Sequence, residues 1–268
     1  MPSTPSTVTN SPNNTLNPYP CPAGHHKTDP PFPLDDDVPY PPLPFICCDQ
    51  FEPDLVDPLV LPDDANSASR ASGHTRPSLY RVHFQGRDCV LKIHRDDTKI
   101  NSFCMEHELG SYARLLFRKV PCVPHCYGYI IFDKATSFTR EIALDISGER
   151  PPFGLLLEFV DGVQMYPKYF TKAEWMLVAQ AALEGLKLIH AARVLHGDPF
   201  PRNILVERRE ATDKEQQFRV VWIDFDDACV WPADDCMTEN ECRREISMTW
   251  ELLFRYLPDA PSDSSSPT

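Results

Sequence analysis

The stretch VLHGDPFPRNILV, residues 194–206, places an acid at Asp198 and a carboxamide at Asn203, five positions apart in a short loop. A helix-like segment precedes the loop, and a β-like run follows it. A carboxylate can accept a proton, and carboxylate and amide oxygens both suit a hard cation such as Mg²⁺. The stretch therefore indicates proton-transfer and metal-binding chemistry.

Two further segments carry side chains that suit the same chemistry. Downstream, the apolar β-type run in VVWIDFDDA (220–228) ends in Asp224 and Asp226. Upstream, CVLKIH places Lys92 in the middle of an apolar strand, where an ammonium is costly unless an anion or a carboxylate meets it. The order lysine, acid, amide, acid is typical of a site that binds the phosphates of a nucleotide.

The composition of the 268-residue chain, 42% hydrophobic and 24% charged, predicts one compact domain large enough for two lobes. The formal net charge of −13 argues against a nucleic-acid partner, because binding a phosphate backbone depends on Lys and Arg. No apolar run approaches the roughly eighteen residues that span a bilayer, and the N-terminus lacks the basic cap and apolar segment of a secretory signal. We therefore expect a cytoplasmic or nuclear monomer that is not secreted and has no membrane partner.

The ten cysteines follow no regular spacing. A structural zinc site needs paired ligands at regular intervals, so the sequence favours free thiols in a reducing compartment.

The prolines crowd the first sixty residues and the extreme C-terminus, which divides the chain into regions. Residues 1–44 and 259–268 are rich in Pro and Ser, bury too little apolar surface to offset their ordering entropy, and are predicted to be disordered tails. Between them, residues 45–258 form the predicted domain, with an N-terminal lobe over 45–160 and a C-terminal lobe over 161–258. The interrupted apolar segment from Phe45 to Pro62 is expected to supply an edge strand or a packed extension.

The N-terminal lobe is predicted to hold a hairpin and one helix. Residues 79–84 and 89–94 are β-like runs joined by QGRD, which predicts a hairpin with Lys92 on its second strand. Residues 100–119 have the apolar spacing of an amphipathic helix. Glu108 lies on the apolar stripe of that helix, whereas Glu106 lies roughly 200° away around it, so Glu108 is the predicted partner of Lys92.

Two further strands, residues 127–132 and 154–160, complete this lobe, with a loop or short irregular insertion between them. The second ends in EFVDG, where Glu158 to Val160 offer extended backbone that can pair with a purine edge, and Gly162 allows a turn. Glu158 and Val160 are therefore candidate nucleotide contacts.

The C-terminal lobe is predicted to be mainly helical. Thr171 followed by Glu174 is a capping-box signature, and a long helical repeat follows it up to the opening stretch. Residues 241–257 predict one closing helix. Two strands are also predicted in this lobe, one at residues 204–206 and one that leads into Asp224, with a loop between them.

Phosphoryl transfer requires positioning and charge neutralisation more than covalent work by the protein. In this interpretation Lys92, held by Glu108, grips the α and β phosphates, and Asp198 takes a proton from an acceptor hydroxyl. Asn203 and Asp224 supply oxygens for Mg²⁺. Taken singly, each residue also has an ordinary structural explanation: a buried ion pair, a turn cap or a loop amide. The ordered set favours the nucleotide site.

The motif HGDPFPRNILV resembles the catalytic loop of the protein-kinase-like superfamily, in the HGDxxxxN form of aminoglycoside and choline kinases and fungal protein-kinase-like proteins. IDFDDA resembles the metal-binding segment of these proteins, and the similarity extends over about residues 79–257. It implies an α+β bilobal kinase-like fold, with a small antiparallel β N-lobe containing one helix and a reduced, mainly helical C-lobe. It also implies ATP and Mg²⁺ as cofactors.

The resemblance assigns a role to each matching position. Asp198 corresponds to the catalytic acid or base, and Lys92 corresponds to the phosphate-binding lysine with Glu108 as its partner. Asn203 and Asp224 correspond to the metal ligands.

The sequence departs from the superfamily pattern at several positions. No GxGxxG precedes Lys92, and no APE-like segment follows the metal-binding segment. Gly197 stands where regulated protein kinases have an arginine. Phe200 stands where a lysine or histidine faces the transferred phosphate, so Arg202 is the candidate replacement for that charge. Asp226 stands at the position of the DFG glycine and is a candidate second metal contact.

Two functions remain open at this stage. One is an ATP- and Mg²⁺-dependent phosphotransferase that moves a γ-phosphate to a hydroxyl of an unknown small molecule or protein. The alternative is a catalytically weak or inactive kinase-like module, a pseudokinase, that binds a partner. The missing glycine loop, Phe200 and the short C-terminal lobe motivate this alternative.

Overall fold

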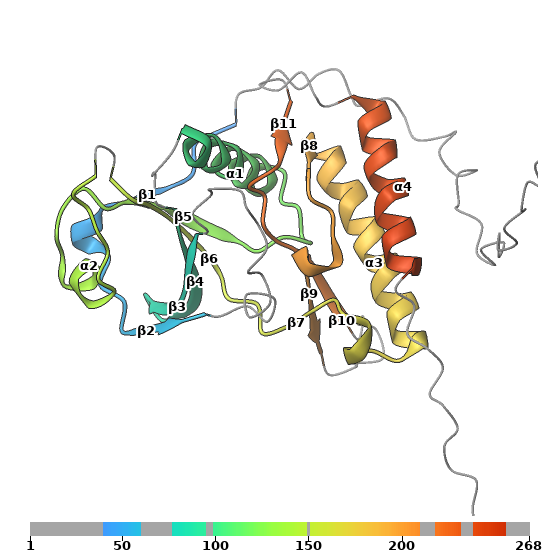
Figure 1. The fold of residues 1–268 in the computed structure, drawn as a ribbon, viewed down its shortest axis with the longest axis horizontal. Helices are drawn as coiled ribbons and strands as arrows, with labels where there is room; N and C mark the ends of the chain where they lie inside the picture. Colours follow the sequence, from blue (N-terminus) through green and yellow to red (C-terminus); the bar gives the residue numbers. More distant parts are fainter. Residues whose placement is uncertain are drawn as a thin grey trace, which may run out of the picture. The chain divides into compact units, whose positions relative to one another are not determined.

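The computed structural model describes residues 40–59, 77–94, 99–148, 151–209, 218–231 and 238–255. These residues form a mixed α+β structure with three sheets and four α-helices (Figure 1). The predicted disordered tails lie outside the described residues, apart from 40–44. Among the helices described, none combines the length and the apolar character that crossing a membrane requires.

The largest sheet has six strands in the order β1-β5-β6-β4-β3-β2. The segment from Phe45 to Pro62, expected to supply an edge strand, supplies one at each edge of this sheet. The prediction of an antiparallel sheet is wrong at one edge, because β1 pairs with β5 in parallel. β1 belongs to the segment that enters the domain and adds to the edge that β5 leaves open. The strand bounds are β1 Phe45–Ile46, β2 Leu55–Pro58, β3 Ser78–Phe84, β4 Arg87–His94, β5 Cys126–Ile131 and β6 Phe153–Glu158.

The start of this sheet shifts the boundary of the predicted N-terminal tail. Leu43 is buried in the main core, and the Pro44 carbonyl accepts a hydrogen bond of 2.9 Å from the Tyr129 amide. These residues lie within the predicted tail but pack against the domain, because they lead directly into β1.

The predicted hairpin is confirmed as β3 and β4, which pair from Ser78↔Ile93 to Phe84↔Arg87. Its two-residue turn has φ of 50° at Gln85 and 74° at Gly86, the backbone conformation that tight hairpin turns favour. Because side chains alternate along a strand, Leu91 and Ile93 enter one apolar cluster while Lys92 faces the other side of the sheet.

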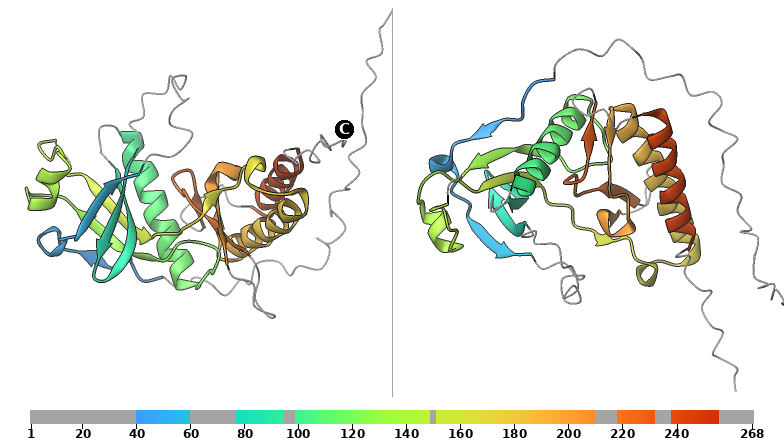
Figure 2. Two further views of the ribbon diagram at one scale, coloured as in Figure 1. Left: turned by 90° about the horizontal axis from the view of Figure 1, so that it is seen from below. Right: turned by 45° about the horizontal axis from the view of Figure 1, so that its top comes forward.

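The predicted helix over 100–119 is observed as α1, Lys99–Phe117. It contacts β5 of the sheet and also β8 and β11 of the C-terminal part (Figures 1 and 2). α1 thus lies where it can join the sheet to the rest of the fold.

The stretch between β5 and β6, predicted to be a loop or an irregular insertion, contains the short helix α2, Ser137–Glu141, capped by Thr136.

The C-terminal part contains two long helices and five strands, so it is less exclusively helical than predicted. The capping box of Thr171 and Glu174 is confirmed by both of its hydrogen bonds. α3 packs against α4 and against β10 (Figure 2). The bounds are β7 Val163–Gln164, α3 Lys172–Ala191, β8 Val194–Leu195, β9 Ile204–Arg208, β10 Phe218–Trp222, β11 Cys229–Val230 and α4 Glu239–Arg255, with 3-10 turns at Cys48–Gln50, Pro167–Tyr169 and Pro201–Asn203.

Candidate active site

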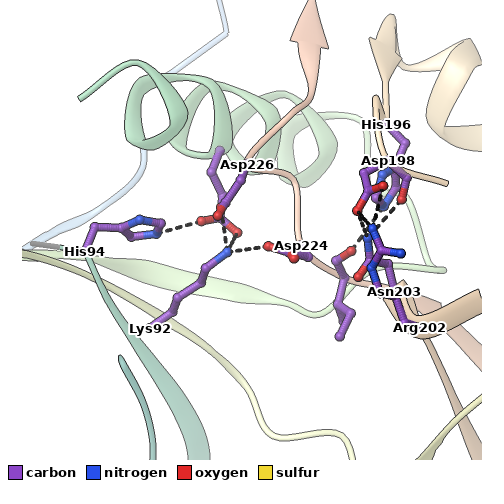
Figure 3. A network of polar contacts seen from close by, with 10 residues as sticks. Lys92, His94, His196, Asp198, Arg202, Asn203, Asp224 and Asp226 are labelled. Atoms are coloured by element: carbon purple, nitrogen blue, oxygen red, sulfur yellow. Dashed lines mark hydrogen bonds and ion pairs between the residues drawn. The ribbon is translucent and has the colours of Figure 1, made fainter. Parts of the chain in front are cut away.

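Lys92 is the centre of a buried cluster of charges (Figure 3). Its Nζ lies 2.8 Å from Glu108 Oε1, 2.7 Å from Asp224 Oδ1 and 2.6 Å from Asp226 Oδ1. The Lys92 side chain is 7% exposed and that of Glu108 is fully buried. The predicted pairing of Lys92 with Glu108 is therefore confirmed, and the two downstream aspartates meet the same ammonium.

The electrostatics of the cluster follow from burial and from charge. Burial alone would lower the pKa of Lys92, but the three carboxylates outweigh it and hold this pKa well above its ordinary value. Burial would raise the pKa of Glu108, but Lys92 and a hydrogen bond from His94 lower it overall. Burial and the charge of Glu108 raise the pKa of Asp226. Lys92 is therefore a fixed cation, and Asp226 is protonated more easily than Glu108.

His94 is a member of this cluster that sequence reasoning missed. Its Nε2 lies 2.9 Å from Glu108 Oε2, and its side chain is 6% exposed. It stands two residues after Lys92 on β4, so both side chains face α1. The two-residue separation from Lys92 along the strand was the signal in the sequence that could have identified His94. His94 orients the Glu108 carboxylate from the side opposite Lys92.

A second cluster lies in the loop of the opening stretch (Figure 3). Arg202 Nη2 donates to both oxygens of the Asp198 carboxylate, at 2.9 and 2.7 Å. Asn203 Nδ2 donates to Asp198 Oδ2 at 2.8 Å and to the Asp198 carbonyl at 2.9 Å. The Arg202 guanidinium also lies 4.4 Å from the centre of the Phe200 ring. Asp198 is thus held by a cation and an amide at once.

The backbone joins this loop to the segment that carries the aspartates. The Asn203 carbonyl accepts a hydrogen bond of 2.9 Å from the Ile223 amide, one residue before Asp224. Asp224 has φ of 67°, a strained conformation for a residue with a side chain, which the surrounding structure must hold. In Figure 3, Asp224 lies between Lys92 and the cluster around Asp198. The structure therefore brings together seven of the predicted site residues from four separate stretches of the chain: Lys92, Glu108, Asp198, Arg202, Asn203, Asp224 and Asp226.

Glu245 on α4 holds the loop that carries Asp198 in place, and the sequence alone did not predict this role. It is 5% exposed, and its carboxylate accepts hydrogen bonds from the backbone amides of His196 at 3.2 Å and Gly197 at 2.7 Å. His190 Nε2 lies 2.6 Å from the same carboxylate. Burial would raise the pKa of Glu245, but the hydrogen bond with His190 and nearby charges lower it overall. An acid on the apolar face of α4 was the signal available in the sequence.

Gly197 stands where regulated protein kinases have an arginine, and the backbone explains the glycine. Its φ is 81°, and a Cβ added there would lie 1.9 Å from the Asp227 carbonyl oxygen. The loop and the aspartate segment pass too closely at this point for any side chain. His196 lies beside it, buried, with its pKa lowered by burial and its Nε2 3.1 Å from the Ile223 carbonyl.

Glu158 is the last residue of β6, and Val160 lies two residues after it. The Glu158 side chain makes a bidentate ion pair with Arg219, at 2.6 and 2.8 Å, and its amide donates to the His125 carbonyl at 2.8 Å. Val160 is buried, and its carbonyl accepts a hydrogen bond from Gly162. Their contact with a nucleotide stays a prediction.

The oxygen donors of the site fit a magnesium ion. The side-chain amide nitrogen of Asn203 donates hydrogen bonds to Asp198, so the amide oxygen is the atom of this side chain that suits a metal. The Asp224 side chain is 44% exposed and the Asp226 side chain 25% exposed, so water and phosphate oxygens can complete a coordination shell. Asn203, Asp224 and Asp226 are hard oxygen ligands of the kind that Mg²⁺ prefers.

Comparison with known families agrees with this geometry. Residues 156–231 match the lipopolysaccharide kinase (Kdo/WaaP) family, a branch of the protein-kinase-like superfamily. The matched segment contains Asp198, Asn203 and Asp224, whereas Lys92 and Glu108 lie before it. The resemblance to the protein-kinase-like superfamily is thereby confirmed, and the match indicates a kinase-like phosphotransferase. No curated protein matches the chain.

Proposed function

We propose that the chain is an ATP- and Mg²⁺-dependent phosphotransferase that transfers the γ-phosphoryl group of ATP to a hydroxyl acceptor. The observation that carries the proposal is the convergence on Lys92 of Glu108 from α1 and of Asp224 and Asp226 from the segment after β10. In a nucleotide complex the Lys92 ammonium binds phosphate oxygens, and Glu108 keeps it in place.

The fold that we propose is the bilobal kinase-like arrangement. The six-stranded sheet with α1 forms the N-terminal lobe, and α3, α4 and the short strands form the C-terminal lobe. The segment from Glu158 to Val160 is the hinge between them. Because the Glu158 amide already donates to His125, a purine edge would meet the Glu158 carbonyl and the Val160 amide.

The loop at Asp198 performs the acceptor chemistry in this proposal. The Asp198 carboxylate accepts the proton of the acceptor hydroxyl, and it must lie within about 3 Å of that hydroxyl to do so. Arg202 now occupies both of its oxygens. Rotation of Arg202 toward the transferred phosphoryl group frees the carboxylate and supplies the charge that Phe200 cannot.

Bound Mg²⁺ supplies charge neutralisation of the β and γ phosphates. Asn203, Asp224 and Asp226 would hold it, and Lys92 would bind the phosphate oxygens beside it. The matched family is named for lipopolysaccharide, whereas we propose for this chain only the chemical class of the acceptor, a hydroxyl group.

The experiment that tests this function is ATP turnover by the purified chain with Mg²⁺, with a chelator, and with Asp224→Asn. We expect turnover to need Mg²⁺ and to fall at least ~100-fold in the variant, because a metal-holding carboxylate is lost. Glu184→Gln, which removes an exposed acid on the outer face of α3, is the matched control and should leave turnover unchanged. Turnover that persists in the chelator or in Asp224→Asn refutes the proposal.

A further inference from the structure

A cavity of about 460 Å³ lies at the C-terminal end of α1, beside Glu158 of the proposed hinge and apart from the clusters around Lys92 and Asp198. Its walls come from α1, the loop over 118–125, the end of β6 and β10. Lys92, Asp198 and Asp224 are not among its lining residues. The loop is fixed on its other side, where the Cys122 carbonyl accepts a hydrogen bond of 2.8 Å from the Trp222 amide. The cavity is therefore bounded by ordered elements.

Its size and lining suit a small organic molecule. Sites for such molecules span roughly 300–1,000 Å³ and have mainly apolar walls with a few polar groups. Here Leu115, Leu116, Val120 and Val123 contribute apolar wall. The first polar group at this cavity is Tyr112.

The Tyr112 hydroxyl is a buried polar group in need of a partner. The side chain is 1% exposed and lines the cavity. Within the described part of the chain, its hydroxyl has no hydrogen-bond partner. A buried hydroxyl without a partner is unfavourable, so an acceptor atom of a bound molecule would stabilise it.

The charges of the lining favour an anion, although the whole chain carries −13. Arg219 and Glu158 neutralise each other in their bidentate ion pair. Lys119 remains: it is exposed, lines the cavity and forms no ion pair with any residue in the described ranges. The ion pair and Lys119 together leave a net charge of +1 on the lining.

The backbone at Lys119 gives a second reason to single it out. The residue ends α1 with φ of 53°, and the Val120 amide bonds back to the Leu115 carbonyl at 3.0 Å. Helix ends of this kind usually use glycine, because a side chain is strained at positive φ. A lysine here accepts that strain, and its exposed side chain lines the cavity.

We propose that this cavity is a binding site for a small amphipathic anion: an apolar body with an internal hydrogen-bond acceptor and a terminal carboxylate. The body fills the space between Leu116 and Val123. The acceptor receives the Tyr112 hydroxyl, and the carboxylate pairs with Lys119. The site shares Glu158 with the proposed hinge but includes neither Lys92 nor Asp198, and its test needs no catalysis.

The test is titration of the ¹⁵N-labelled full chain with 4-benzoylbenzoate, an aromatic ketone with a carboxylate, followed by amide chemical shifts. The matched probe is 4-benzoylbenzamide, which lacks the charge. We expect saturable shifts at the amides of Leu116, Val120 and Cys126, with about 2- to 5-fold weaker binding of the amide probe, the contribution of an exposed ion pair.

Three variants separate the contributions. Lys119→Gln should weaken binding of the carboxylate probe about 2- to 5-fold and leave binding of the amide probe unchanged, and Tyr112→Phe should weaken binding of both probes equally. Leu116→Trp should fill the cavity and abolish the binding of both probes. The dispersion of the remaining amide signals reports whether the Leu116→Trp variant is folded. The proposal is overturned by the absence of saturable shifts around the cavity up to about 1 mM probe. It is equally overturned by binding to which Lys119→Gln makes no difference.

Discussion

Replacement of Lys92 by methionine tests the charge cluster on which the account rests. The substitution keeps the length of the side chain and removes its charge, leaving the Glu108 carboxylate, fully buried, without its ammonium. Breaking a buried ion pair from one side costs about 3–5 kcal/mol. Asp224 adds little to the loss because its side chain is 44% exposed, and Asp226, whose pKa is already raised, can bind a proton instead. We therefore expect a loss near the lower limit, about 3 kcal/mol.

Urea unfolding and thermal melting measure this loss. For a domain of this size, about 3 kcal/mol corresponds to a fall in Tm of roughly 6–12 °C. The double variant Lys92→Met with Glu108→Gln should recover about half of the loss, since it removes the buried carboxylate that has lost its ammonium. Lys187→Met breaks the exposed pair with Glu184 and should cost less than about 0.5 kcal/mol. A Lys92→Met loss below about 1 kcal/mol would refute the buried cluster.

Two further predictions concern the loop at Asp198. Glu245→Gln weakens the bonds to the loop amides and should cost about 2 kcal/mol at pH 7. Because folding lowers the pKa of Glu245, its contribution is fully present above about pH 4.5 and is lost as the pH falls through the folded pKa, so the difference in Tm from the unaltered chain should shrink below about pH 4; a constant difference contradicts this. Arg202→Met should lower ATP turnover at least ~100-fold with less than ~3-fold change in Mg-ATP affinity, if the guanidinium acts on the transferred phosphoryl group. Equal turnover by the two proteins would remove Arg202 from the chemistry.

The sequence predicted the centre of the site because short-range rules fix its parts. Alternation along β4 predicts which way Lys92 faces, and the helical period of α1 predicts that Glu108 rather than Glu106 meets it. The end of an apolar strand predicts the place of Asp224. Each of these inferences needs only the geometry of one element, and the family resemblance joined them across the chain.

The parts that the sequence did not predict depend on long-range packing. Glu245 reaches the loop only because α4 packs beside α3, and no local pattern gives that pairing. β1 finds its place from the free edge of β5, which is a property of the assembled sheet. The need for glycine at position 197 comes from the approach of Asp227, a residue thirty positions away. His94 was within reach of the alternation rule, but a histidine at a strand end has many ordinary explanations.

The most direct test of the central claim is the ATP turnover of Asp198→Asn beside its affinity for Mg-ATP. Asparagine keeps the shape and the hydrogen bond with Asn203 while removing the proton-accepting charge. We predict that turnover falls at least ~100-fold, the contribution of a general base, while Mg-ATP binds within about 3-fold of the unaltered chain. Unchanged turnover in Asp198→Asn would contradict the account.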